Sequence, residues 1–398
     1  MSKQLVFILI VLTVLLYAVS TVQWFQSQET TPASFVQDVP VLFSFPAPSF
    51  QEEEFISPAG DNQVHAASIA ELKDGTLAAV WYGGKYEGSP DTQIYFATRS
   101  RGSQIKEWSS PCSIVNRISA AKELNRYIKK IGNPLLFTDN ENRLQLLFVS
   151  VSIGGWSGSS LNLKVSPDSG KTWTPSQRLT LSPFFNISEL VRNNPLQLAN
   201  GDFVVPIYHE CLGIFSELLW LKPGTGPNIP PYFKTRLTWG TGYLQPSMIS
   251  TSPHSAAVFH RSHRDKSYVT MSFTNDTGAT WTAPQKIDIP NPGSGLNALR
   301  LSDGRILLAF NDSPIRRDNL TLAVSNKGPT EGEYTERHGK EFQQWQRVAV
   351  LENTPGEEFS YPYMIRTRDG KIHLVYTWQR KRIKHVTFNE EWLEKRIK

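Results

Sequence analysis

The chain has 398 residues, of which 39% are hydrophobic and 19% charged, with 11 Trp and a formal net charge of +5. This composition is typical of a globular protein, and its many Gly, Pro and Trp residues favour turns and strands over helices. The mild positive charge favours anionic partners, but no basic run resembles a nucleic-acid-binding stripe, so no nucleic acid is expected as a partner. The densest basic cluster, Arg380-Lys381-Arg382 with Lys384, is interpreted as a solvated face of a terminal strand.

The N-terminus carries a hydrophobic segment. Leu5–Val19 is apolar apart from Thr13, and Ser20–Phe25 extends it to about 21 residues, which as a helix just spans a hydrocarbon core of about 30 Å. Ala18-Val19-Ser20 also resembles a small-residue cleavage site, so a removed signal peptide and an uncleaved membrane anchor both stay open. Lys3 is the one charge before the apolar run and would stay inside. The remainder is therefore predicted to be exported, either membrane-anchored outside the cytoplasm or secreted or periplasmic.

Composition also divides the chain into three parts. Residues 1–25 form the leader, and residues 26–50, rich in Ser, Thr, Pro and Gln, are predicted to be a linker. The folded domain is expected over residues 51–398. Cys112 and Cys211 lack the spacing of metal ligands, and no metal or cofactor is expected.

A hairpin signal recurs through the domain. Each copy is a strand, an Asp-Gly or Asn-Gly turn and another strand, because tight hairpins need residues that tolerate positive φ. Four full copies and two degenerate ones occur at intervals of roughly 50 to 65 residues; they lie at 72–77, 198–203, 301–306 and 368–372, and at 138–144 and 252–258. The strands that follow the turns alternate or run apolar. Six four-stranded units of this length predict a closed six-bladed β-propeller, an all-β fold without exposed sheet edges.

A second motif interleaves with the turns. Residues 166–173 fit Ser-x-Asp-x-Gly-x-Thr-Trp at every position, and residues 274–281 fit it with Thr in place of Ser. The chain here resembles the sialidase superfamily, whose members carry such Asp-boxes on the rim of a six-bladed propeller. The resemblance implies that Asp168 and Asp276 are structural. Ser100–Trp108 and Ser325–Trp345 resemble eroded copies, the second with a charged insertion, Lys327–Gln344, predicted to be a surface loop.

The resemblance extends over about Ser57–Phe388 and implies an active site in which three arginines bind a substrate carboxylate. A planar guanidinium matches a carboxylate bidentately. Where the family has its first arginine, this sequence has His65, so that arginine is missing. Arg261 matches the second, and Arg317 in Arg317-Asp318-Asn319-Leu320 matches the third, with Arg316 as the adjoining alternative.

The family's nucleophile is a tyrosine with a glutamate partner, because a neutral phenol meets less repulsion at an anionic sugar than a carboxylate does. Tyr361 lies at the place of the nucleophile, whereas the glutamate position holds Gln245. Glu210, at the end of an apolar strand, is a possible substitute, and His209 beside it could bind glycan hydroxyls. As a metal site this pair is weak.

The remaining candidates lie on a loop and at strand entrances. The loop 83–91 is expected to supply the acid, with Asp91 preferred and Glu87 second. Arg192, before Asn193-Asn194-Pro195, stands where strand entrances converge on the central channel and could supply the missing positive charge. Asn133-Pro134 and Asn297 occupy similar places in their blades.

Three functions fit these residues. The first is an exo-acting glycoside hydrolase of sialidase type, cleaving a terminal sialic acid or related acidic sugar from glycans through Tyr361. The second is a polysaccharide lyase or hydrolase on uronate-containing glycans, with His65, His209, Arg261 and Tyr361 as its charge and proton shuttle. The third is a non-catalytic glycan-binding propeller. In each case the expected partner is an acidic glycan.

Overall fold

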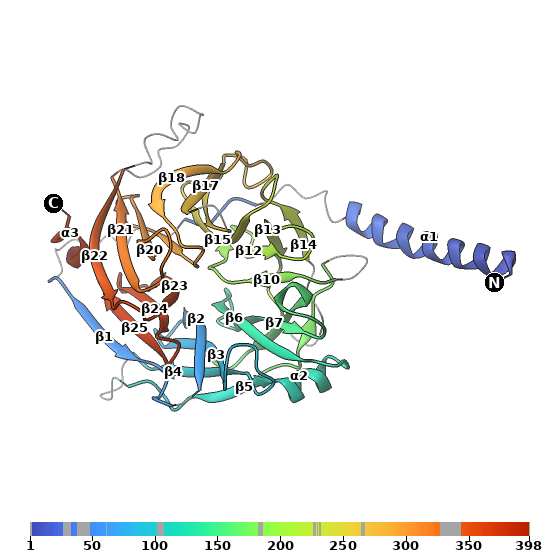
Figure 1. The fold of residues 1–398 in the computed structure, drawn as a ribbon, viewed down its shortest axis with the longest axis horizontal. Coiled ribbons are helices and arrows are strands. Elements are labelled where there is room, and N and C mark those ends of the chain that lie inside the picture. Colours follow the sequence, from blue (N-terminus) through green and yellow to red (C-terminus); the bar gives the residue numbers. More distant parts are fainter. Residues whose placement is uncertain are drawn as a thin grey trace.

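The computed structural model describes residues 2–26, 33–37, 48–60, 62–101, 107–181, 186–225, 228, 230, 232–263, 267–326 and 344–397. Six antiparallel sheets surround one axis as the blades of a propeller (Figure 1). The predicted all-β six-bladed architecture is confirmed.

The first three blades follow one another in chain order, each from an innermost to an outermost strand. Blade 1 contains β2 (Gln63–Glu71), β3 (Leu77–Gly84), β4 (Gln93–Arg99) and β5 (Cys112–Asn116). Blade 2 contains β6 (Lys130–Thr138), β7 (Leu144–Val151), β8 (Ser159–Ser166) and β9 (Gln177–Arg178). In blade 3 the innermost strand is split, so that β10 (Glu189–Val191) and β11 (Leu196–Gln197) both pair with β12 (Phe203–His209), followed by β13 (Phe215–Leu221) and β14 (Tyr232–Arg236).

The last three blades repeat the pattern and close the ring. Blade 4 contains β15 (Tyr243–Ser250), β16 (Ala256–Ser262), β17 (Tyr268–Thr274) and β18 (Gln285–Pro290). Blade 5 contains β19 (Asn297–Arg300), β20 (Ile306–Phe310), β21 (Asn319–Ser325) and β22 (Trp345–Asn353). Blade 6 contains β23 (Phe359–Arg366), β24 (Ile372–Trp378), β25 (Arg382–Phe388) and, from the N-terminal side, β1 (Gln51–Phe55). Because β1 pairs with β25, one sheet joins both ends of the domain and covers the last edge.

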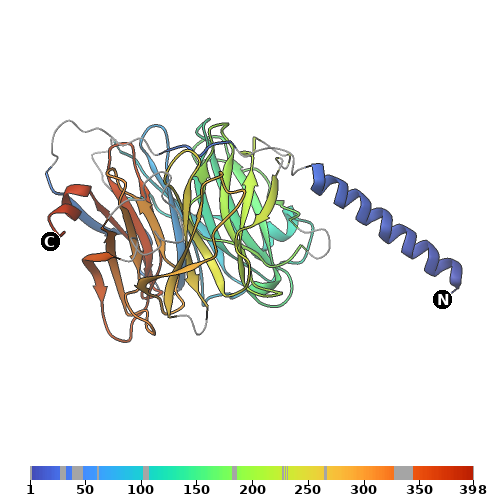
Figure 2. The same cartoon turned by 90° about the horizontal axis from the view of Figure 1, so that it is seen from above.

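The helices are short apart from the first. Helix α2 (Arg117–Glu123) follows β5, with Asn116 as its N-cap, and α3 (Glu390–Glu394) ends the chain; the 3₁₀ turn η1 (Trp156–Gly158) precedes β8. Helix α1 (Lys3–Gln26) lies apart from the ring of blades (Figure 2). Across the described residues, no helix combines the length and apolarity needed to cross a membrane. Export of the domain stays a prediction.

All six predicted hairpin turns join an innermost strand to its neighbour, and they share one backbone hydrogen bond. In blade 1 it runs from Gly75 N to Leu72 O at 2.9 Å, and in blade 2 from Asn142 N to Asp139 O at 3.0 Å. Gly75 and Asn142 both have positive φ, 82° and 67°, which is why Gly or Asn stands at this place. All six turns therefore lie at one end of the channel, called here the turn end.

The two Asp-boxes have the same internal hydrogen bonds. The Asp168 carboxylate accepts from Thr172 N at 2.8 Å and from Thr172 Oγ1 at 2.6 Å. Asp276 accepts from Thr280 N at 2.8 Å and from the Thr280 hydroxyl. Each carboxylate is used within its own turn, as a structural role requires. The box tryptophans are half-buried against the core, and the insertion predicted at Lys327–Gln344 lies almost wholly outside the described residues.

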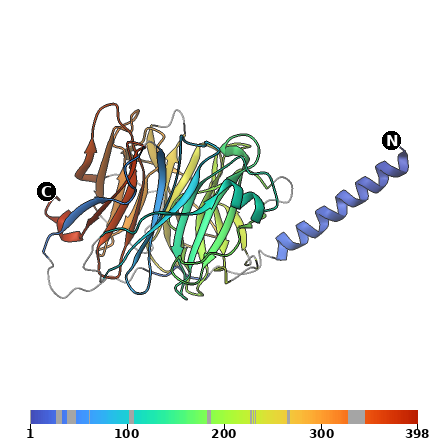
Figure 3. The ribbon, with the colours of Figure 1, turned by 90° about the horizontal axis from the view of Figure 1, so that it is seen from below.

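Part of the predicted linker packs on the turn end. Phe35 is 2% exposed and forms a β-bridge with Leu198 of blade 3. Val36 N donates to Gln197 O at 2.8 Å, so residues 33–37 form a strap across the turn end. At the other end lie the loops between second and third strands and the connections between blades; this end is called the mouth face (Figure 3).

Candidate active site

Four innermost strands bulge close to the mouth. In β2, β6, β15 and β23 the inner strand has one extra residue, so that two of its residues lie opposite one residue of the neighbouring strand, and the first of the two has positive φ. These residues are Ala66 (52°), Asn133 (44°), Gln245 (47°) and Tyr361 (56°). In β6, β15 and β23 the next residue is a proline, which has no N–H to donate to the neighbouring strand. The bulge changes the direction of the side chain that precedes the proline. Asn133, Gln245 and Tyr361 therefore occupy equivalent backbone positions in their blades.

Arg192 joins the bulges beneath the mouth. It is 2% exposed and follows the short strand β10. Nη1 donates to Ala67 O at 3.1 Å, and Nη2 donates to the carbonyl oxygens of Tyr361 and, at 3.4 Å, Pro362. Burial lowers the pKa of Arg192 to about 10, so the guanidinium is still charged at neutral pH. Its charge is committed to backbone carbonyls of blades 1 and 6, and it braces the channel rather than facing a ligand.

Three asparagines continue this brace around the channel. Asn193 Nδ2 donates to Gln245 O at 3.0 Å, and Asn194 Nδ2 donates to Met364 O at 2.8 Å. Asn297 Nδ2 donates to the Asn194 side chain at 2.8 Å, while its oxygen accepts from Met364 N at 2.9 Å. Blades 3, 4, 5 and 6 are thus held together through side-chain amides. Buried amides that are fully hydrogen-bonded specify one arrangement of the inner strands.

A chain of alternating charges crosses the mouth from blade 1 to blade 5. Glu87 lies 3.7 Å from His65 Nε2 and 2.9 Å from Arg380 Nη1. Arg380 Nε also contacts Glu358 at 2.7 Å, and Glu358 lies 3.8 Å from Arg317 Nη1. Burial by itself would raise the pKa of Glu358, but the hydrogen bond and charge of Arg380 outweigh it and hold that pKa below its usual value. Glu358 is therefore ionised and paired with Arg380 at neutral pH, and Glu87 contacts the same guanidinium.

His65 stands at the blade 1 end of this chain. It is wholly buried, and neither ring nitrogen has a hydrogen-bond partner among the described residues. Its ring stacks on Tyr82 at 5.8 Å and meets the ring of Tyr361 edge-on at 5.5 Å. Burial lowers the pKa of His65 to about 4, so the imidazole is neutral at pH 7. An unsatisfied buried imidazole is unfavourable for folding and points to a role in binding or chemistry.

A second chain, of hydrogen bonds, crosses the mouth from blade 4 to blade 2. Arg261 Nη1 donates to Gln245 Oε1 at 2.9 Å, and Gln245 Nε2 donates to Tyr208 Oη at 3.2 Å. Asn133 Nδ2 reaches the same phenol at 3.4 Å. Burial raises the pKa of Glu210, and the charge of Arg261 only partly opposes it. Tyr361 lies between the two chains. Its ring meets His65 of the first chain at 5.5 Å, and together with Gln245 Oε1 of the second chain it borders the space beside Gly295.

Two of the sequence candidates have side chains turned away from this cluster. Asp91 is exposed, and its carboxylate accepts from Lys85 N at 3.1 Å and from the Ser89 hydroxyl of its own loop. Arg316 has a side chain that is 70% exposed and pairs with Asp318 at 3.2 Å. Glu87 and Arg317, the neighbouring candidates, are the ones that enter the mouth.

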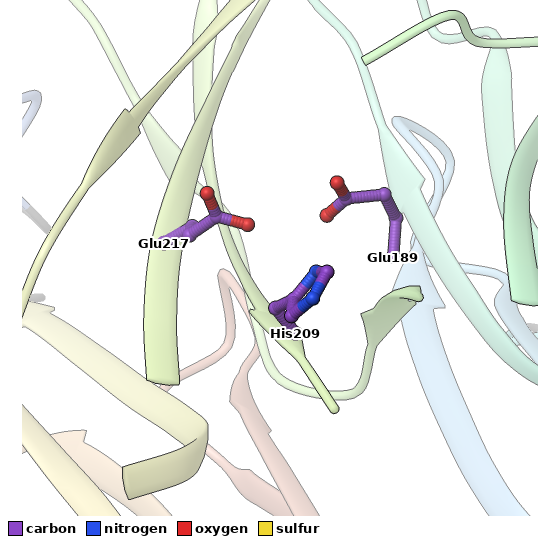
Figure 4. A group of neighbouring side chains, drawn as sticks. All are labelled: Glu189, His209 and Glu217. Atoms are coloured by element: carbon purple, nitrogen blue, oxygen red, sulfur yellow. The ribbon is translucent and has the colours of Figure 1, made fainter. Parts of the chain in front are cut away.

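His209 faces another part of the molecule. Successive side chains on a strand point to opposite faces, and Tyr208 already points toward Gln245. His209 therefore lies on the far face of blade 3, with Glu189 and Glu217 (Figure 4). Lys234 Nζ lies 2.6 Å from Glu189 and 3.1 Å from Glu217, so an ammonium supplies the cation. His209 Nε2 accepts from Leu212 N at 3.2 Å, which places the proton of the neutral ring on Nδ1. A protonated Nδ1 does not fit a metal ligand.

The structure adds residues that the sequence reasoning did not select. Arg380 and Glu358 join the charge chain, and Tyr82 and Tyr208 line the mouth. The interpretation of residues 380–384 as a solvated face is wrong for Arg380, whose side chain makes two ion pairs. The bulged positions, by contrast, carried a signal in the sequence: an X-Pro pair lies close to the start of several innermost strands, at Asn133-Pro134, Asn194-Pro195, Gln245-Pro246 and Tyr361-Pro362.

A cavity of about 320 Å³ lies at the turn end of the channel, away from these groups. Its lining combines backbone with mainly apolar side chains such as Phe137 and Met248, and Val36 of the strap borders it. We place the candidate active site at the mouth, because the buried titratable groups, the bulges and the arginines converge there.

Comparison with known proteins fits this architecture. Residues 75–374 match the family described as BNR repeat-like domain. The chain belongs to that family. No curated protein sequence matches it. This BNR repeat-like propeller thus falls within the sialidase-like superfamily that its Asp-boxes predicted.

Solved structures resemble this BNR repeat-like propeller in fold. A protein of unknown function from Dyadobacter fermentans is 14% identical, with a TM-score of 0.65, 85% of this chain and 98% of that chain covered. The intramolecular trans-sialidase from Ruminococcus gnavus is 14% identical, with a TM-score of 0.63, covering 84% and 96%. The Penicillium chrysogenum alpha-L-arabinanase is 13% identical, with a TM-score of 0.56, covering 88% and 100%. At such identities the likeness establishes the fold alone.

Proposed function

We propose that this propeller is a glycoside hydrolase of sialidase type that releases a terminal sialic acid or related acidic sugar from glycans. The observation that carries the proposal is the arrangement of His65, Tyr361 and Glu87. A buried neutral imidazole without hydrogen bonds lies edge-on to a phenol and 3.7 Å from a carboxylate. Such a group can accept the proton of the phenol when the phenol becomes a nucleophile.

The arginines at the mouth support an anionic substrate. Arg261 and Arg317 come from blades 4 and 5, and Arg380 adds a third guanidinium from blade 6. In our proposal Arg380 supplies the charge that is missing at His65. Each of the three guanidinium groups already contacts a protein group, which would limit the rotamer entropy lost when a carboxylate binds.

In the proposed reaction Tyr361 Oη bonds to the anomeric carbon while the bond to the leaving oxygen breaks. His65 takes the phenolic proton, and Glu87 orients the imidazole. Gln245 cannot take this proton, because an amide is not a base. Among the carboxyls of the mouth cluster, Glu210, whose pKa burial raises, is the one best able to hold a proton for the leaving oxygen. Water then attacks the anomeric carbon and gives a proton to Glu210, the bond to Tyr361 Oη breaks, and His65 returns its proton to the phenolate.

The test compares Tyr361→Phe with Tyr363→Phe on the same strand. The parent and both variants are incubated with a panel of sialylated and uronate-containing glycans, and binding and release are measured together. Tyr361→Phe should lower turnover by at least about 10³-fold, since no oxygen remains to attack, and leave binding within about twofold. Tyr363→Phe should keep its turnover. Full turnover in Tyr361→Phe would refute the nucleophile, and binding without any parental turnover would assign a glycan-binding module instead.

The same pair of residues favours a second candidate, elimination on a uronate-containing polysaccharide. A neutral His65 could remove the proton beside the carboxylate while Tyr361 protonates the leaving oxygen. The products separate the two reactions. Elimination leaves an unsaturated, ultraviolet-absorbing sugar acid, whereas hydrolysis leaves a saturated one.

We also propose that the domain works outside the cytoplasm, because Lys3 is the one charge before the apolar segment of the leader. Fusing a phosphatase that is active only after export to residue 398 tests this. Activity of the fusion in intact cells is the expected result, and an inactive, stable fusion would contradict it.

A further inference from the structure

Exposed apolar side chains gather on the mouth face. Outside α1, nine large apolar residues of the described chain are exposed, and seven of them lie on the mouth face, six in loops and one in α2. They are Tyr86, Ile118, Tyr127, Ile153, Leu212, Trp239 and Ile315. The other two are Val36 in the strap and Val350 on the outermost strand of blade 5. The described residues of the six hairpin turns include no exposed large apolar side chain, so the two ends of the propeller differ in their exposed apolar surface.

Ordered loops hold these side chains outward. Leu212 and Trp239 are 85% and 88% exposed, and their two loops are joined by the bond from Gly242 N to Ile214 O at 2.7 Å. Ile153 is 81% exposed, and its loop is tied to that of Tyr127 by the bond from Ser152 Oγ to Tyr127 O at 2.7 Å. Single exposed apolar side chains are common on protein surfaces, but the gathering of seven of the nine at one end of the propeller points to a surface that covers them.

Cations accompany the apolar tips. Lys85 precedes Tyr86 and Arg316 follows Ile315. Lys129 is exposed and donates to Gly154 O at 3.1 Å, beside Ile153. Carboxylates of this face pair with cations of the protein itself in Glu87–Arg380, Asp312–Arg347 and Asp318–Arg316, so Arg316 is partly neutralised and the positive charge beside the tips rests mainly on Lys85 and Lys129. A flat surface approaching the mouth would therefore meet apolar tips interspersed with positive charge.

We propose that the mouth face docks on an anionic lipid surface, with the seven apolar side chains entering the interface and the neighbouring cations contacting the headgroups. Separate tips around a ring suit a deformable layer better than a protein partner, whose interface needs a contiguous packed core. Four of the tips are Ile or Leu, which have no ring to stack on a sugar. Trp and Tyr favour the membrane interface, and Lys and Arg near the surface add attraction to anionic lipids. This inference is independent of the reaction at the site.

Two exposed cysteines allow a local test in the full-length protein. Cys211 adjoins Leu212 on the mouth face, whereas Cys112 begins the outermost strand of blade 1. An environment-sensitive fluorophore is attached to Cys211 in Cys112→Ser, and to Cys112 in Cys211→Ser. Because α1 is present in both proteins, it affects both equally. With vesicles of phosphatidylcholine and phosphatidylglycerol, the label at Cys211 should shift to the blue, at least fivefold more than with phosphatidylcholine alone, and the label at Cys112 should not.

Matched variants complete the test. Leu212→Ser with Trp239→Ser should raise the anionic lipid concentration needed for half of the Cys211 signal by about tenfold, and Val350→Ser should leave it unchanged. Thermal unfolding checks that each variant is folded. Raising the salt concentration should weaken the response, because exposed charges are screened. Equal shifts at both cysteines, an unaffected double variant, or a signal that follows protein concentration without lipid would each overturn the proposal.

Discussion

The two ends of the channel use their carboxylates differently, although polar side chains join neighbouring blades at both ends, as Arg368 does at the turn end with Lys73 O at 2.9 Å. At the turn end, carboxylates bond to their own turns, as Asp168 does with Thr172 and Asp139 with Arg143 N at 2.8 Å. At the mouth, polar groups bond across blades, as Arg380 does with Glu87, 293 residues away. His65 and Nε of Arg261 lack hydrogen-bond partners within the described chain. A local turn can repeat six times, whereas the mouth is assembled once from all six blades. Changes in the turns and Asp-boxes should therefore affect stability alone, whereas changes in the cluster at the mouth should affect function, and changes in the brace beneath it stability.

The largest change in stability is expected from Arg192→Met, which removes the hydrogen bonds that join blades 1, 3 and 6 beneath the mouth. Three backbone carbonyl oxygens would lose a charged donor inside the channel. The free energy of unfolding should fall by roughly 3–5 kcal/mol, measured by denaturant titration. Arg382→Met is the control, since Arg382 also donates to a carbonyl, of Ser57, but on an outer strand, and it should cost less than about 1 kcal/mol. A similar small loss in Arg192→Met would contradict the bracing role.

Glu189 should make stability depend on pH. Burial raises its pKa to about 8, with Lys234 opposing and Glu217 adding to the shift. The folded protein then holds a proton that the unfolded chain releases above about pH 4.5, so stability falls as pH rises from about 4.5 to 8. The loss over this window should be about 4 kcal/mol. Glu189→Gln should flatten the curve in this window, as measured by unfolding at a series of pH values. An unchanged slope would show that other groups cause it.

Arg380→Gln should weaken the binding of an acidic glycan by about ten- to a hundred-fold, because one charge-assisted contact is lost. Arg316→Gln is a matched control, since Arg316 lies on the mouth face but outside the cluster. Titration calorimetry with the best glycan of the panel gives both affinities. If the two variants behave alike, the carboxylate is bound elsewhere.

The smallest effect is expected at the rim. Asp168→Ala removes the acceptor for Thr172 N and Thr172 Oγ1, a loss of roughly 1–2 kcal/mol in stability. Asp276→Ala should behave in the same way, because its contacts are the same. Glycan binding should be unchanged in both. A loss of binding without a loss of stability would mean that the rim and the mouth are coupled.

The sequence by itself determined the ring and most of its turns. Tight turns and Asp-boxes are local structures, in which Asp, Gly and Thr satisfy nearby backbone groups, and so Leu72–Thr76 could be recognised without its neighbours. Tyr361, Arg261 and Arg317 were predicted as site residues from the motifs around them, and all three lie at the mouth.

Only the tertiary structure decided what these residues face. Arg192 was expected to offer charge to a ligand but is consumed by carbonyls of blades 1 and 6, and Arg380 was assigned to solvent but lies between Glu87 and Glu358. His209 points away from Tyr208 because neighbouring side chains alternate across a strand. Hydrogen bonds between blades join residues hundreds of positions apart, and no local pattern of residues encodes which blade lies opposite, because the closed ring alone brings them together.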